Sequence, residues 1–231
     1  MRNILLVAAQ SIKNNLKFKV LTVVFLTVTV MIAVGLALIF CLLLLGPALK
    51  SGQSDFKQLA GYLSIIMYST CFIGLGINMN VYSYQSMTRE KAGGQVESLL
   101  VTPLQIKDIW IGKSLAVFLP GMVLGDVMAV IALLVVNYIY LVPAVGFVYT
   151  HWMGLSSFLL LPLIYFGLSL LSHIMGLAGK PASGNLLGQI FLPLGLNLAI
   201  NVVTRGWLDA SSWIFAAANI GLILTLALII L

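Results

Sequence analysis

Six runs of apolar residues, each about 20 residues or longer, constrain this chain more than any other feature of its sequence. A helix needs about 20 mainly apolar residues to cross the hydrocarbon core of a bilayer. The runs are continuous rather than alternating with a period of two, which favours helices over the strands of a membrane barrel. The sequence therefore predicts an all-α polytopic membrane protein, with spans at Val20–Leu45, Leu59–Tyr84, Ser114–Val142, Trp152–Ile174, Leu186–Val203 and Trp213–Leu231.

Composition and charge exclude two other classes of protein. The 231 residues are 61% apolar and 8% charged, whereas a soluble domain carries about 25% charged residues to wet its surface. The net charge is +6, but the twelve Lys and Arg residues are divided among short loops and form no continuous basic stripe for nucleic acid.

Helix breakers fall between the spans and are expected to end them: Pro47, Gly52, Gly93, Gly94, Pro143, Gly179, Pro181 and Gly206.

The distribution of basic residues predicts the orientation, because cytoplasmic loops collect Lys and Arg. With the N-terminus inside, nine basic residues are cytoplasmic and three are outside: Arg2, Lys13, Lys17, Lys19, Arg89, Lys91, Lys107, Lys113 and Lys180 against Lys50, Lys57 and Arg205. The four tryptophans fall at predicted span ends, where an amphipathic ring prefers the headgroup layer: Trp110, Trp152, Trp207 and Trp213. We therefore expect both termini in the cytoplasm and a multi-pass protein of the cell (plasma) membrane.

The chain divides into an amphipathic helix at residues 1–19 and a six-span transmembrane domain at 20–231. On a helix, Ile4, Leu5, Ala8, Ile12 and Leu16 share one side, and polar residues share the other. Such a segment is suited to lying in the cytoplasmic interface of the membrane, in contact with lipid. The alternative is a helical extension of the first span.

The longest loop, residues 85–113, lies on the predicted cytoplasmic side. Val96, Leu99 and Leu100 repeat at helical spacing, and Pro103 ends the short helix because proline cannot continue the hydrogen-bond ladder. A second amphipathic piece begins at Asp108 and leads into the third span. A short helix with an apolar edge can dock into a groove of a partner protein, and it can equally be a connector at the interface.

Three segments of this loop resemble the coupling loop of type-2 ABC transporter permeases, the membrane subunits of exporters. They are Arg89-Glu90-Lys91, Glu97-Ser98-Leu99-Leu100-Val101-Thr102-Pro103-Leu104 and Gly112-Lys113. The six spans and the preceding amphipathic helix fit the same family. The stretch Ala92–Val96 is slightly longer than the usual pattern. The fifth span also lacks the small-residue, aromatic and proline motif that many drug and polysaccharide exporters carry.

The resemblance implies a permease subunit that forms the translocation pathway and works as a homodimer or heterodimer of permease subunits. It implies that the loop docks into a cytosolic ABC ATPase subunit through Arg89, Glu90, Glu97, Leu99, Leu100, Thr102 and Pro103. The chain has no phosphate-binding loop of its own, so ATP and Mg are expected on the partner subunit. No cofactor and no enzymatic activity are expected of this chain. A haem or cytochrome-maturation type export permease is a variant within the same class.

Polar residues inside the spans are the remaining candidates. Asp126 is the one acid deep within a predicted span and is costly there unless it faces protein or water. It would carry the coupling ion of a secondary (ion-coupled) transporter, or it would form a structural hydrogen bond with an amide such as Asn78, Asn80 or Asn197. The same amides either line a pathway or join helices. His173 is expected to be a packing residue, and Gly121-x-x-x-Gly125 permits a close helix approach. No residues are spaced as a catalytic set or a metal site.

Overall fold

The computed structural model describes residues 2–17, 19–51, 55–92, 105–178 and 181–231. These residues form an all-α bundle without strands, and six of the helices are long and apolar enough to cross a membrane. The predicted fold class is therefore confirmed. The spans run over Thr22–Ser51, Phe56–Tyr82, Ile106–Val145, His151–Gly176, Leu186–Thr204 and Trp213–Ile230. The helices are α1 (Arg2–Asn15), α2 (Lys19–Phe40), η1 (Cys41–Leu45), α3 (Gly46–Ser51), α4 (Phe56–Ala92), α6 (Ile106–Val136), η2 (Asn137–Leu141), α7 (Val142–Val145), α8 (His151–Leu155), η3 (Ser156–Leu160), α9 (Leu161–Ala178), α10 (Pro181–Thr204) and α11 (Trp213–Ile230).

Prolines do not end the first and third spans, contrary to the prediction from Pro47 and Pro143. Each of these prolines follows a π-helical turn, η1 or η2, and the helix continues for about one more turn as α3 or α7. Pro162 follows the third such turn, η3, in the same way. Proline lacks an N–H and its ring clashes with the carbonyl four residues earlier. That carbonyl lies inside the π-helical turn in all three cases. A π-helical turn bonds five residues back rather than four and so relieves the clash without breaking the span.

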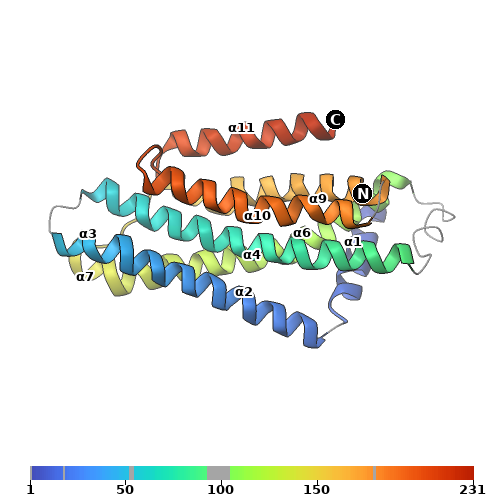
Figure 1. Ribbon diagram of the computed structural model, residues 1–231, viewed down its shortest axis with the longest axis horizontal. Coiled ribbons are helices and arrows are strands. Elements are labelled where there is room, and N and C mark those ends of the chain that lie inside the picture. Colours follow the sequence, from blue (N-terminus) through green and yellow to red (C-terminus); the bar gives the residue numbers. More distant parts are fainter. Residues whose placement is uncertain (1, 18, 52–54, 93–104, 179–180) are drawn as a thin grey trace.

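Helix α4 is the centre of the bundle. In its most apolar window 89% of the residues are buried, against 28% for the first span and 17% for the fifth. It packs against α2, α6, α9 and α10 (Figure 1). Its 37 residues correspond to about 55 Å of helix, which exceeds the roughly 30 Å of the hydrocarbon core. The last turns of α4, beyond Tyr82, therefore project past the apolar part of the bundle.

Glycines bring α4 and α6 into direct backbone contact. A Cβ added at Gly74 would lie 2.7 Å from the Cα of Gly125, and one added at Gly125 would lie 2.9 Å from the carbonyl oxygen of Cys71. One turn away, a Cβ at Gly121 would lie 2.8 Å from the amide nitrogen of Asn78. The small-residue motif of α6 therefore packs within the chain, against α4. The expected close helix approach is confirmed.

Helix α1 is separate from α2 and lies steeply to it across one end of the bundle (Figure 1). The interpretation of residues 2–15 as an extension of the first span is therefore wrong. One part of the apolar surface of α1 packs against the bundle, and another part is exposed. Ala8 is buried, and Val7 and Ile4 meet the start of α6 at Gly112, where an added Cβ would lie 2.8 Å from the Cβ of Val7. Leu5 is 63% exposed, which leaves an apolar surface for the membrane interface.

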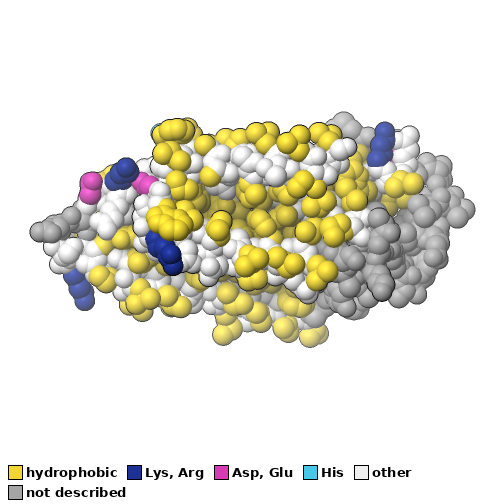
Figure 2. All heavy atoms as spheres, turned by 45° about the horizontal axis from the view of Figure 1, so that its top comes forward, with side chains coloured by type: hydrophobic (Ala, Val, Ile, Leu, Met, Phe, Trp, Pro, Cys, Tyr) yellow, Lys and Arg dark blue, Asp and Glu magenta, His cyan; other side chains and the backbone are white. Residues whose placement is uncertain are grey.

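The two ends of the bundle differ in charge. The end that holds α1, the last turns of α4, the start of α6 and the C-terminus is called here the basic end; it carries Lys13, Lys17, Lys19 and Lys107 (Figure 1). At the opposite end lie Lys50, Lys57 and Arg205. Charged side chains gather at the ends, and the face between them is broadly hydrophobic (Figure 2). This distribution is the one that a bilayer requires of a spanning protein.

We predict that the basic end faces the cytoplasm. In a variant whose buried cysteines Cys41 and Cys71 are replaced by alanine, Ser86→Cys should react only with a reagent that enters the cytoplasm. Ser54→Cys should react with an impermeant reagent added outside. The physical reason is the excess of basic residues at one end. Labelling of the Ser86→Cys protein by the impermeant reagent in intact cells would invert the orientation.

Candidate functional site

The predicted coupling segment begins on α4. Arg89 and Glu90 belong to the helical backbone of its last turns, beyond the apolar span. The other five predicted coupling residues, Glu97, Leu99, Leu100, Thr102 and Pro103, lie outside the residues that the structure describes. The described part of the chain therefore establishes what holds the segment at each end: the central helix α4 before it and α6 after it.

The second amphipathic piece of the loop is joined to the third span rather than separate from it. Helix α6 begins at Ile106, after Gln105 in an extended conformation, and continues through the apolar run to Val136. Asp108 lies in its first turn, where a carboxylate interacts favourably with the helix dipole. A displacement of the segment that precedes Gln105 would therefore act directly on a membrane-spanning helix.

A polar contact between α6 and α9, which the sequence pattern does not predict, lies just inside the basic end. Trp110 does not simply face the headgroup layer: its indole N–H donates to the carbonyl oxygen of Leu170 at 2.9 Å. One turn further on, Ser169 Oγ donates to the carbonyl oxygen of Ser114 at 3.1 Å. The Ser114 hydroxyl lies 3.0 Å from the carbonyl oxygen of Trp110 on its own helix and 3.4 Å from that of Ser169. These bonds between helices join the start of α6 firmly to α9.

Two titratable side chains are buried beside this contact. Lys113 is 3% exposed and His173 is fully buried. The Nδ1 of His173 is 2.8 Å from the carbonyl oxygen of Ser169 and donates to it. The buried Nε2 of the same ring has no hydrogen-bond partner among the described residues, so only one ring nitrogen is satisfied and the packing role of His173 stays a prediction. Lys113 is not a loop cation, which corrects its place in the orientation count. The sequence holds one clue to the burial of Lys113: both of its neighbours, Gly112 and Ser114, are small, and close helix packing needs small residues.

Asp126 makes a different contact from those considered for it. Its Oδ1 is 3.8 Å from the Sγ of Cys71 on α4, which is too long for a strong hydrogen bond. The Cys71 thiol also donates to the carbonyl oxygen of Ser157, in the π-helical turn η3, at 3.3 Å. Asp126 is half-buried. The carboxyl group therefore sits beside the α4–α6 contact and close to η3.

The candidate asparagines act mainly as connections between helices. Asn78 donates to the carbonyl oxygen of Val117 at 2.6 Å and ties α4 to α6. Asn80 donates to that of Gly188 at 3.1 Å and ties α4 to α10. Asn197 is exposed and bonds with Asn201 on its own helix at 3.0 Å. Amide bonds between membrane helices contribute about 0.6 kcal/mol each on average, so the contacts of Asn78 and Asn80 are those of the structural alternative, although the buried Oδ1 of Asn80 has no partner among the described residues.

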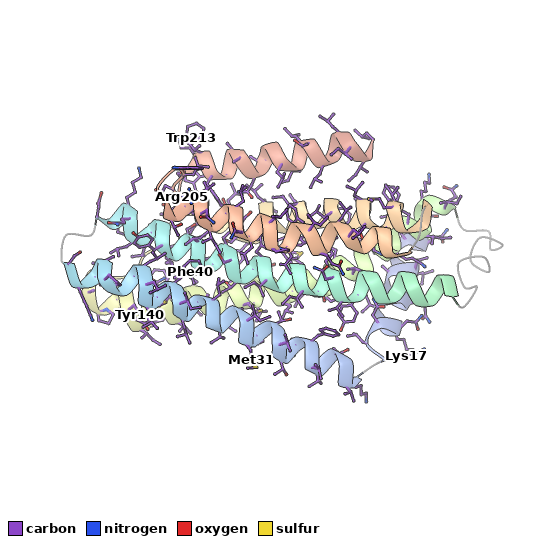
Figure 3. All side chains as sticks on the ribbon, in the orientation of Figure 1. Lys17, Met31, Phe40, Tyr140, Arg205 and Trp213 are labelled. Carbon is purple, nitrogen blue, oxygen red and sulfur yellow. The ribbon has the colours of Figure 1, made fainter. Side chains whose placement is uncertain are left out.

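A polar pocket of about 450 Å³ opens at the opposite end of the bundle, between the start of α4 and the loop that joins α10 to α11. Its charged lining residues come from both segments: Asp55, Lys57, Arg205 and Asp209. Asp209 accepts two hydrogen bonds from Ser211, from its backbone N–H at 2.8 Å and its hydroxyl at 2.7 Å, so that carboxylate already shapes the loop. Arg205 and Trp213 mark this region in Figure 3, and acidic and basic side chains gather there in Figure 2.

Within the described ranges, no group of three or more His, Cys, Asp or Glu side chains is placed to hold a metal ion. The arrangement that stands out is mechanical: a buried central helix continues into a charged segment, and α6, which follows it, is joined to both α9 and α1. In the comparisons with known proteins, no family model, no curated protein and no solved structure matches this chain.

Proposed function

We propose that this chain is the membrane-spanning permease subunit of an ATP-driven ABC exporter. In this proposal it forms the translocation pathway in the cell membrane together with a second permease subunit, identical or homologous. Segment 85–113 couples the chain to a separate cytosolic ATPase that binds ATP and Mg, and docks into it through residues 89–103. The observation that carries the proposal is the continuity of α4, which runs through the centre of the bundle and out past its apolar end to Ala92.

The packing of α4 gives the coupling a mechanical route. A force applied near Arg89 acts along a rigid helix whose backbone touches α6 at Gly74 and Gly125. The same force reaches α6 from its own start at Ile106, so both sides of the α4–α6 contact are driven together. Helices joined by backbone contact and close packing cannot deform gradually and instead shift as units. Such a shift is what alternating access between the two sides of the membrane needs.

A secondary transporter that uses Asp126 is the second candidate, and the position of that carboxyl group beside the α4–α6 contact is what favours it.

The test of the exporter proposal begins with the tagged wild-type chain, purified from its native membranes with the proteins bound to it. We expect an ATPase subunit with a phosphate-binding loop to co-purify, and its ATP hydrolysis to increase in the complex. Without such a subunit, the exporter proposal fails.

We predict that Asp126→Asn leaves ATPase binding and the increase in hydrolysis close to wild type. An amide keeps the size and hydrogen-bonding capacity of the side chain, whereas ion coupling requires the carboxylate. The variant should also fold normally, because the polar contact between Asp126 and Cys71 is long, 3.8 Å. Asn197→Asp, which places a carboxyl group on an exposed position of α10, serves as a control for charge at mid-span. A folded Asp126→Asn protein that binds the ATPase but no longer stimulates it would give Asp126 a direct role.

A further inference from the structure

Two hollows lie one after the other between α2 and α6, with α4 as their floor, and are called here the α2–α6 groove. They share no lining residue, and Ala33, Ile73 and Met128 pack together where they meet. Helix α2 packs mainly on α4 and diverges from α6 (Figure 1). The part of the groove nearer the opposite end has a volume of about 250 Å³ and is lined by side chains such as Val34, Ala37, Ile131 and Val135. The part nearer the basic end has a volume of about 130 Å³ and includes Phe25 and Leu124. Together the two parts have a volume of about 380 Å³, a little above the lower limit of small-ligand pockets, about 300 Å³.

The groove follows most of the thickness of the membrane. Its lining on α2 extends from Thr22 to Cys41, which corresponds to about 28 Å of helix, close to the roughly 30 Å of a hydrocarbon core. Figure 3 shows its extent: Lys17 lies at one end of α2, and Phe40 and Tyr140 lie toward the other. The groove is therefore parallel to the acyl chains of the surrounding lipid.

Several of the hydroxyls that line the groove are already bonded within the protein. The hydroxyls of Thr29 and Thr70 donate to carbonyl oxygens of their own helices, Phe25 at 2.7 Å and Met67 at 2.9 Å. Tyr82 Oη donates to Thr22 Oγ1 at 3.1 Å, near the basic end. With these hydroxyls bonded and the rest of the lining mainly apolar, the site offers little to a polar solute and accepts a hydrocarbon chain. The occupant must therefore be apolar along this length.

Exposed cations stand at the basic mouth of the groove. Leu16 lines it, and Lys17 is the next residue. Lys19 lies one helical turn before Thr22, which also lines the groove, so the two residues share a side of α2. Both lysine side chains are exposed. Basic residues at this depth attract anionic headgroups.

We propose that the α2–α6 groove binds an anionic amphiphile from the membrane, with its acyl chain between the two helices and its headgroup at Lys17 and Lys19. Lipid tails are as apolar as leucine side chains, so the acyl chain contributes only its fit to the groove. The two lysines select for an anionic headgroup. Binding stands independently of the exporter proposal. The further step, that this amphiphile is the exported substrate class, rests on that proposal.

The experiment uses the full chain in phosphatidylcholine vesicles that contain a small fraction of either phosphatidylglycerol or phosphatidylcholine with a diazirine in the acyl chain. After illumination, labelled peptides are identified by mass spectrometry. We expect phosphatidylglycerol to label α2 and α6 preferentially over α10 and α11, although the spans of α10 and α11 are the more exposed. Replacing both lysines, Lys17→Gln with Lys19→Gln, should lower that labelling by about five-fold for each lysine. Lys50→Gln, at the opposite end, should leave it unchanged.

A bulky side chain that fills the groove should also displace the acyl chain of the lipid. Ala37→Phe projects a ring into the groove and should reduce labelling of α2 and α6, whereas Ala218→Phe, on the exposed side of α11, should not. If Ala37→Phe lowers the melting temperature, Val34→Phe replaces it, because Val34 is 51% exposed and tolerates a larger side chain. The proposal is wrong if labelling is equal on all exposed helices or is insensitive to these variants. It is also wrong if Val34→Cys forms a disulfide between two copies, since a second copy would then cover the groove.

These results separate the two proposals. Labelling of the groove requires no ATPase, so specific labelling without any co-purifying ATPase would support the lipid site and reject the exporter. Conversely, an ATPase complex whose groove is not labelled would leave the exporter proposal intact and reject the site. With both present, phosphatidylglycerol should stimulate hydrolysis by the wild-type complex and fail to stimulate it in Ala37→Phe.

Discussion

Replacing Leu100 with aspartate should abolish co-purification of the ATPase subunit and the increase in its ATP hydrolysis. The predicted coupling helix offers two apolar anchors, Leu99 and Leu100, and a few buried side chains usually dominate an interface. An aspartate at this position would bury an unpaired charge in the docking surface of the ATPase subunit. A loss of about 2 kcal/mol or more, typical of such an anchor, corresponds to binding about 30-fold weaker. The measurement is affinity purification with quantified ATPase recovery, followed by the hydrolysis assay.

A matched control separates the coupling helix from the loop in general. Ile106 is 67% exposed at the start of α6, so Ile106→Asp introduces the same charge nearby without affecting the predicted helix. That charge is also tolerated at a helix N-terminus. The Ile106→Asp protein should bind the ATPase as the wild type does, and both variants should remain monodisperse. Normal ATPase binding by Leu100→Asp would reduce the segment to a connector, and the exporter proposal would then depend on the six-span fold alone.

Replacing Gly74 with leucine should strongly destabilise the folded bundle. An added Cβ would lie 2.7 Å from the Cα and 2.9 Å from the backbone nitrogen of Gly125. These are backbone atoms, which cannot move aside as a flexible side chain can, so α4 and α6 would have to separate. Overpacking a core costs about 1–3 kcal/mol, and occasionally more. Because α4 is the central helix, we expect the upper end of that range, seen as a lower melting temperature and aggregation on size-exclusion chromatography.

Gly221→Leu on α11 is the matched control, because no heavy atom lies within 4 Å of a Cβ placed there. It makes the same change in composition and helix propensity at an open position of a span. We expect that variant to purify like the wild type. If Gly74→Leu were equally well behaved, α4 and α6 would not be in backbone contact, and the mechanical route proposed through them would be lost.

The spans were predictable because each depends on its own local composition. About 20 apolar residues must leave water whatever their neighbours are, and the six spans were accordingly found at nearly the predicted residues. Their ends were less predictable. Pro47 and Pro143 indicate breaks when considered alone, but a π-helical turn before each of them lets the helix continue. Whether a helix ends at a proline or continues through a π-helical turn depends on what the next turn can pack against. The residues around the proline do not contain that information.

The site was predictable only in part. The sequence placed Arg89 and Glu90 in a charged segment after the second span, and they lie in the last turns of α4. The role of residues 97–103 stays a prediction. The burial of Lys113 could not be anticipated, because a basic residue at a span end normally reaches water. It is buried here because α1 and α9 both pack on the first turns of α6.

By itself, the sequence determined that this is a polytopic helical membrane protein and which segments cross the membrane, because transfer from water to lipid is a sum over single residues. Tertiary structure decided which helix is central, which partner the glycines of α6 meet and where a groove remains between α2 and α6. Those outcomes depend on the pairwise fit of helix surfaces. In lipid the hydrophobic effect favours no particular partner, so close packing and hydrogen bonds between helices make the choice.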